Sequence, residues 1–103
     1  MSVTNKDEII EILKNNSSVL RDLGVEKIGL FGSYIRNEQL QDSDVDLLVE
    51  FISGRKSFRN LMALADYTEK TLGKKVDIVT LESLSPYIAP HINKEVFYVQ
   101  IAN

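Results

Sequence analysis

The chain has 103 residues, of which 44% are hydrophobic and 26% are charged, and its net charge at pH 7 is −3. These values are typical of a single folded domain, here residues 1–103, and they exclude intrinsic disorder and strong nucleic-acid binding. The sequence has no cysteine, which excludes disulfides, thiolate catalysis and zinc held by cysteine. Because it also has no signal-like or membrane-spanning apolar run, we expect a cytoplasmic protein without membrane contact.

The first predicted element is a helix over residues 5–15. Thr4 is its expected N-cap, with Asp7 three residues later as a capping-box partner. The apolar stripe of this helix continues beyond a break near residues 16–17. Gly24 follows as the expected glycine that ends the helical region.

Two strands are predicted next, over residues 25–31 and 44–51, because both stretches are rich in β-branched and other apolar residues. Between them, Gly32 and Ser33 predict a turn. A short helix over residues 33–37 is expected to follow this turn.

A long helix is predicted from its N-cap Ser57 through Leu72, with Gly73 as its stop. We expect its buried stripe to consist of Phe58, Leu61, Met62, Ala65 and Leu72. A third strand over residues 76–80 follows.

The last helix is predicted to begin near residues 84–86, with Pro86 tolerated in its first turn. The segment after it, residues 95–100, fits a helix or an edge strand equally well. The resulting order is α-β-(short α)-β-α-β-α, which predicts an α/β fold with helices packed on a small sheet.

The second and third strands are separated by a helix, which predicts that they are parallel and joined by a crossover. Parallel strands begin at the same edge of a sheet. Asp44 and Asp46 open the second strand, on one face because side chains alternate, and Asp77 lies near the start of the third. We therefore expect these three carboxylates to lie within reach of one another.

Three neighbouring carboxylates repel one another, and a divalent cation removes that repulsion. Carboxylate oxygens together with substrate phosphates are the usual ligands of Mg²⁺. Backbone N–H groups and the hydroxyl at the turn formed by Gly32 and Ser33 predict an anion site opposite the carboxylates. The constellation favours phosphoryl-type transfer with one or two Mg²⁺ ions and with Asp77 as general base.

These residues resemble the minimal nucleotidyltransferases of the DNA polymerase beta superfamily. The family pattern is a strand, Gly-Ser, an Arg a few residues later, Asp-x-Asp about ten residues further on, and a third Asp on a later strand. Here Gly32-Ser33, Arg36, Asp44-Val45-Asp46 and Asp77 match it, and the element order agrees over most of the chain. The sequence departs from the pattern after the Arg, where Gly is common and Asn37 stands, and before it, where Ala is common and Ile35 stands.

The resemblance implies a DNA polymerase beta-like core with a small mixed β-sheet. It also implies transfer of AMP from ATP to a tyrosine of a HEPN-type toxin, with the chain as the antitoxin of the pair. Gly32, Ser33 and Arg36 would bind the nucleotide. Asp44, Asp46 and Asp77 would be the catalytic residues and the ligands of two Mg²⁺ ions.

Two other functions remain open at this stage. One is an antitoxin that blocks its toxin sterically without catalysis, which the intact set of three aspartates disfavours. The other is a nucleotidyltransferase for a small molecule, although the chain is short for enclosing such an acceptor unless it forms a homodimer. His91, the only histidine, and Tyr34 are expected to have packing or surface roles.

Overall fold

The computed structural model describes residues 2–102, so the outermost residues of the expected domain lie outside it. Its elements in chain order are α1 (Lys6–Asn15), α2 (Ser17–Asp22), β1 (Val25–Phe31), β2 (Val45–Phe51), α3 (Phe58–Leu72), β3 (Val76–Thr80), the 3₁₀ helix η1 (Leu81–Ser83), α4 (Ala89–Glu95) and β4 (Phe97–Gln100). Within residues 2–102, no helix combines the length and apolar character that crossing a bilayer requires.

The four strands form one mixed sheet in the order β3-β2-β1-β4. The β2 and β3 strands pair in parallel, which confirms the predicted crossover through α3. Both neighbours of β1 are antiparallel to it. The C-terminal segment that sequence patterns left ambiguous is therefore the edge strand β4.

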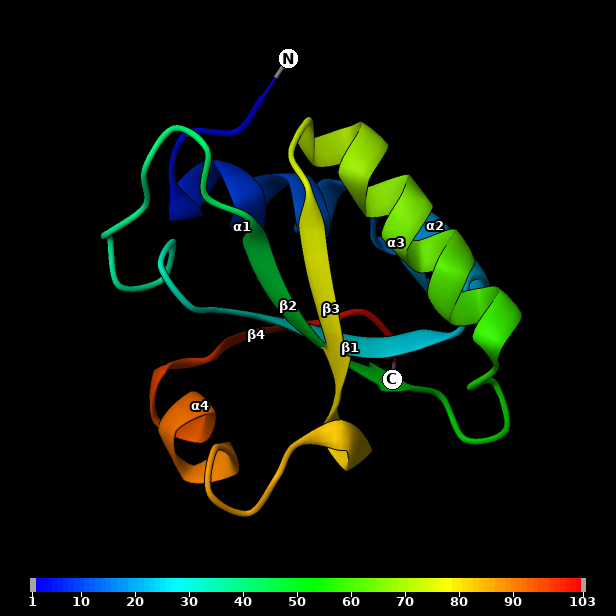
Figure 1. Ribbon diagram of the computed structural model, residues 1–103. Helices are drawn as coiled ribbons and strands as arrows, with labels where there is room; N and C mark the ends of the chain where they lie inside the picture. The colour runs from blue at the N-terminus through cyan, green and yellow to red at the C-terminus, as the bar shows by residue number, and fades with distance from the viewer. Residues whose placement is uncertain (1, 103) are drawn as a thin grey trace.

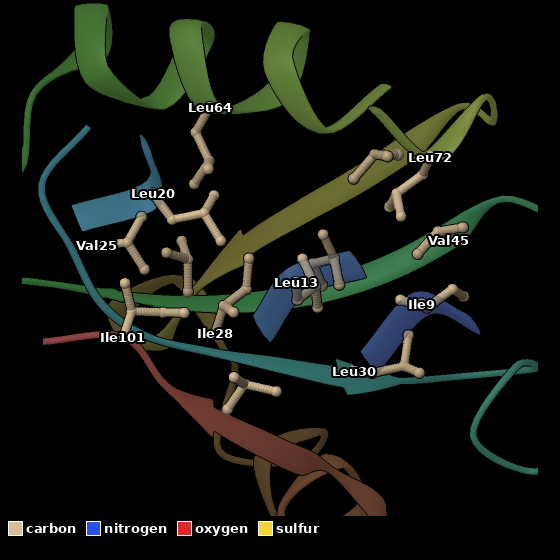
Figure 2. Packing of buried hydrophobic residues seen from close by; sticks show 14 of the residues in the cluster. Ile9, Leu13, Leu20, Val25, Ile28, Leu30, Val45, Leu64, Leu72 and Ile101 are labelled. Atoms are coloured by element: carbon tan, nitrogen blue, oxygen red, sulfur yellow. The ribbon is translucent and has the colours of Figure 1, made fainter. Parts of the chain in front are cut away.

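The helices are divided between the two faces of the sheet. Figure 1 shows α1, α2 and α3 packed together on one face, whereas η1 and α4 lie toward the other. The main core lies under α1–α3, where Ile9, Leu13, Leu20 and Leu64 meet Ile28 of the sheet (Figure 2). The opposite face of the sheet carries Asp46 and Asp77 together with apolar residues such as Leu48.

The first helix begins one residue later than predicted. Asn5, and not Thr4, is the N-cap, because its side chain accepts a hydrogen bond from the Glu8 N–H at 3.0 Å. The Glu8 carboxylate in turn accepts from the Thr4 N–H at 2.7 Å. A capping arrangement therefore exists, but it joins Asn5 and Glu8 instead of Thr4 and Asp7.

The expected short helix over residues 33–37 is a series of turns. The Glu38 N–H donates to the Ser33 carbonyl at 2.8 Å, and Asn37 has a left-handed backbone with φ of 59°. A left-handed residue cannot continue a right-handed helix. Asn37 thus adopts a left-handed conformation, which asparagine tolerates better than most residues other than glycine.

The long helix α3 has the predicted cap and stop, but its buried face is rotated from the predicted stripe. Leu64, Thr68 and Leu72 are buried, whereas Phe58 and Met62 are 78% and 53% exposed. Thr68 can be buried because its hydroxyl donates to the Leu64 carbonyl at 2.8 Å. A hydrophobicity pattern cannot include a polar residue that satisfies itself in this way.

The last helix begins at Ala89, later than the predicted start near residues 84–86. Proline 90 explains the difference, since it has no N–H to donate in a helix interior and is tolerated only in the first turn. The preceding stretch instead forms η1 and a turn closed by the Ala89 N–H on the Ser85 carbonyl at 2.9 Å. With this later start, α4 spans Ala89–Glu95, and Glu95 is its last residue.

Candidate active site

The turn after β1 is built around a buried glycine that no other residue can replace without strain. Gly32 has φ of 80°, in the left-handed region. A Cβ at this position would collide with the carboxylate of Asp46, whose Cγ would be 2.9 Å away. Glycine is therefore needed here both for its backbone conformation and for the close approach of Asp46.

The carboxylate pair lies on neighbouring strands of the sheet. Asp46 is the register partner of Asp77 across the parallel β2–β3 pair, and of Phe31 on its other side. Side chains at paired positions of parallel strands lie on the same face. Asp44 is exposed and precedes β2 by one residue, so the strand starts at Val45 and not at Asp44.

Electrostatics link the three aspartates. Burial, and after it the charges of Asp77 and Asp44, together raise the pKa of Asp46 to about 6, against the opposing effect of Arg36. A carboxyl group with such a pKa is one whose charged form is poorly compensated by the protein alone. A cation at this position would supply the missing compensation.

The guanidinium of Arg36 is held by two carboxylates. Its Nε donates to Glu38 at 2.8 Å, and its Nη1 donates to Glu95 Oε1 at 3.0 Å. These contacts raise the pKa of Arg36, first through Glu38 and then through Glu95. The Gly32 N–H donates to the other Glu95 oxygen at 2.7 Å, so one carboxylate binds both the turn and the arginine.

A pocket of about 330 Å³ opens beside the aspartates. Asp46 and Asp77 form its polar side, and residues of β1, β3, η1, the loop after η1 and α4 form the rest: Phe31, Ile78, Val79, Ser83, Leu84, Ser85, Ile88 and Ile92. Larger hollows of about 490 and 440 Å³ exist elsewhere, but none of the three predicted aspartates lines them. We place the site at the smaller pocket because it alone of these three combines space with the carboxylate pair.

The carboxylates of the site fit a Mg²⁺ ion whose remaining ligands come from a substrate and water. Within residues 2–102, no three His, Cys, Asp or Glu side chains are gathered closely enough to enclose a metal ion by themselves. Mg²⁺ does not require such a cage, since it is usually held by one or two carboxylates, water and substrate phosphates. Asp46 and Asp77 supply such a pair, and the poorly compensated charge of Asp46 favours a cation.

Comparison with known proteins identifies the fold and its family. The sequence model of the family described as nucleotidyltransferase domain matches residues 6–100 of the chain. The chain belongs to this family. This nucleotidyltransferase is 42% identical over 100 residues to the protein adenylyltransferase MntA of Thermococcus cleftensis, across 96% of the chain and 100% of the relative. The resemblance inferred from the sequence motifs is thereby confirmed.

Solved structures agree with this assignment. The nucleotidyltransferase superposes on a candidate minimal nucleotidyltransferase with a TM-score of 0.72 and 30% identity, covering 94% of this chain and 98% of the other. It also matches a chain of a toxin–antitoxin complex with AMP-PNP, with a TM-score of 0.65, 26% identity, and coverage of 92% and 72%. The predicted polymerase beta-like fold with a mixed sheet is confirmed.

One site residue escaped the sequence analysis. Glu95 contacts Gly32 and Arg36 although it lies 63 and 59 residues away in the sequence. No local motif marks it, and only the pairing of β4 with β1 brings it close. Of the residues expected to be structural, Tyr34 is buried in the core at 1% exposure and His91 is exposed.

Proposed function

We propose that this nucleotidyltransferase transfers AMP from ATP to a tyrosine hydroxyl of a HEPN-type toxin and thereby acts as its antitoxin. The observation that carries the proposal is the carboxylate pair Asp46 and Asp77, which meets a glycine turn at the edge of a pocket. Support for the nucleotide comes from the relative named a protein adenylyltransferase and from the similar complex with AMP-PNP. Support for the partner comes from the toxin–antitoxin pairing in that complex.

In the proposed reaction, the acceptor hydroxyl attacks the α-phosphorus of ATP. A new P–O bond forms, the bond to the bridging oxygen breaks, and pyrophosphate leaves. Asp77 is the proposed base that takes the hydroxyl proton. The turn at Gly32 and Ser33, together with Arg36, would hold the triphosphate through N–H groups, a hydroxyl and a positive charge.

Asp44, Asp46 and Asp77 are the proposed ligands of two Mg²⁺ ions, with Asp44 at the exposed margin of the site. Bound Mg²⁺ would neutralise the charge on the phosphate oxygens. By holding Mg²⁺, the aspartates would position the α-phosphate next to the acceptor, and positioning accounts for much of the catalysis of such transfers.

The decisive experiment is a transfer assay with α-labelled ATP, Mg²⁺ and the toxin encoded beside this protein. We expect label on the toxin, loss of toxicity, and a mass increase of one or more AMP units on a tyrosine. Asp46→Asn should abolish labelling, whereas Asp66→Asn, an exposed aspartate that pairs with Lys70 at 3.5 Å, should not.

The outcome also separates the alternatives. Protection from the toxin by the Asp46→Asn variant, without labelling, would replace catalysis by steric blocking. Label transferred only to small molecules would contradict a protein acceptor. Light scattering on the same samples measures the oligomeric state and tests whether the chain forms a homodimer.

A further inference from the structure

The turn at Gly32 and Ser33, called the phosphate turn below, already binds a carboxylate of the chain itself, that of Glu95. Glu95 Oε2 accepts the Gly32 N–H at 2.7 Å and lies 3.1 Å from Arg36 Nη1. Its second oxygen, Oε1, accepts from the same nitrogen at 3.0 Å. A backbone N–H and a guanidinium are also the donors that bind phosphate oxygens. Glu95 therefore uses two of the groups that the proposed function reserves for the triphosphate.

The position of Glu95 is fixed by the fold. It is the last residue of α4, one turn after the buried Ile92, and directly precedes the segment that leads into β4. That segment packs closely on β1, because a Cβ at Gly29 would lie 2.5 Å from a methyl group of Val96. The side chain of Glu95 is only 24% exposed. Its contact with the turn is thus more than a chance meeting of two flexible surface chains.

The charge of Glu95 is unfavourable for an incoming polyanion. Asp44, Asp46 and Asp77 already contribute three carboxylates to the site, and Glu95 is the third carboxylate, after Asp77 and Asp44, whose charge acts on Asp46. Arg36 is the cation that acts on the same carboxyl. A triphosphate that takes Arg36 must therefore displace Glu95 or share the guanidinium with it.

We propose that Glu95 is a positioning residue that occupies the phosphate turn in the nucleotide-free protein and is displaced from Gly32 and Arg36 when ATP binds. Glu95 then weakens ATP binding by competing for the same donors, and it keeps the turn in its binding conformation while the site is free. The inference rests on the proposed function only in assigning the triphosphate to this turn.

The test compares Glu95→Gln with a matched control, Glu38→Gln. The amide oxygen of glutamine can still accept the Gly32 N–H, but the competing charge is gone. The side chain of Glu38 also pairs with Arg36, at 2.8 Å, but it is 66% exposed, and the Gly32 N–H donates to Glu95 and not to Glu38. The pair of variants separates competition at the turn from a general change of charge around Arg36.

We expect Glu95→Gln to bind Mg²⁺–AMP-PNP about two- to five-fold more tightly by calorimetry, the range for loss of one partly exposed ion pair. The KM for ATP should fall without a rise in kcat, a separation that a merely structural role would not produce. Glu38→Gln should change either value less than about two-fold. Unchanged or weaker binding by Glu95→Gln, in a variant whose melting temperature shows it to be folded, would overturn the proposal.

A measurement on the wild-type protein covers the case in which the variant does not fold. Inorganic tripolyphosphate should shift both the NMR amide resonance of Gly32 and the side-chain carboxyl resonance of Glu95, because the phosphate replaces the Glu95 carboxylate at the Gly32 N–H. A shift of Gly32 with no change at Glu95 would contradict displacement. Wild-type protein that binds neither AMP-PNP nor tripolyphosphate would overturn the proposed function as well, whereas normal binding without tightening in Glu95→Gln overturns the displacement alone.

Discussion

One face of β2 is apolar at Val45, Leu47 and Val49, whereas the other carries Asp46 and Glu50 on either side of the buried Leu48. Val45, Leu47 and Val49 point into the core and are at most 1% exposed. Asp46, between them, lies on the other face beside Asp77. The comparison shows how one strand supports both stability and a site, because apolar burial on one face offsets the repulsion of carboxylates on the other.

The largest expected effect comes from a substitution that changes only the carboxylate-bearing face of β2. Asp46→Asn should lower the rate of nucleotidyl transfer about 1,000-fold, or about 4 kcal/mol, because it removes a proposed ligand of the catalytic cation. The variant should nevertheless stay folded, because the change is nearly isosteric and removes a repelling charge. Single-turnover labelling and thermal unfolding measure the two effects. A folded variant with full activity would contradict the assignment of Asp46.

The next largest effect is expected from a substitution that changes only the core face of β2. Leu47→Ala should lower the free energy of unfolding by about 3 kcal/mol, since a fully buried leucine leaves a cavity. The affinity of the folded protein for Mg²⁺–AMP-PNP should not change. Leu40→Ala is the control, because Leu40 is 71% exposed and should tolerate the change in urea unfolding. Equal destabilisation by both variants would contradict the placement of the core.

A third comparison sharpens the contact between the glycine turn and β2. Gly32 and Gly54 have nearly the same backbone, with φ of 80° and 83°, but no atom lies within 4 Å of a Cβ built at Gly54. Gly54→Val therefore introduces backbone strain alone, whereas Gly32→Val adds the collision with Asp46. We expect Gly32→Val to cost about 2 kcal/mol more in chemical unfolding. Equal free energies of unfolding for the two variants would show that the Asp46 side chain moves aside without cost.

The smallest effect is a pH dependence of stability. Asp46 has a folded-state pKa of about 6, above its ordinary value of 3.8. The folded state therefore holds its proton more tightly, so this group's stabilisation is present below about pH 4 and is lost as the pH rises through 6. After allowance for solvent screening we expect about 1 kcal/mol, equivalent to about 4–8 °C in melting temperature.

The matched measurement is thermal unfolding of wild type and Asp46→Asn, in EDTA, between pH 4 and 7. The difference between the two curves isolates Asp46 from carboxylates such as Glu8 and Glu82, whose pKa values are lowered and which act in the opposite direction. A difference that does not vary with pH would contradict the raised pKa.

Local patterns predicted the parts of this molecule that local chemistry controls. The bounds of β1 and β3 are confirmed, because glycines and apolar runs mark them, and the crossover rule placed Asp46 beside Asp77. The buried face of α3 was missed because Thr68 satisfies its own hydroxyl. Glu95 was missed because its role depends on strand pairing between distant parts of the chain. Sequence motifs thus selected the aspartates and the glycine turn of the candidate site, but not Glu95, which accepts hydrogen bonds from Gly32 and Arg36.

The pairing of the two distant strands also has a consequence for how the protein folds. Residues 27–30 of β1 pair with residues 97–100 of β4, so this contact closes a loop of about 70 residues. Such contacts form late and slowly compared with local ones. A growing chain that has emerged only through β3 already has both aspartates and the glycine turn, but it lacks Glu95. We expect the anion-binding turn to acquire its internal carboxylate last, so nascent chains would present a phosphate site without its built-in competitor.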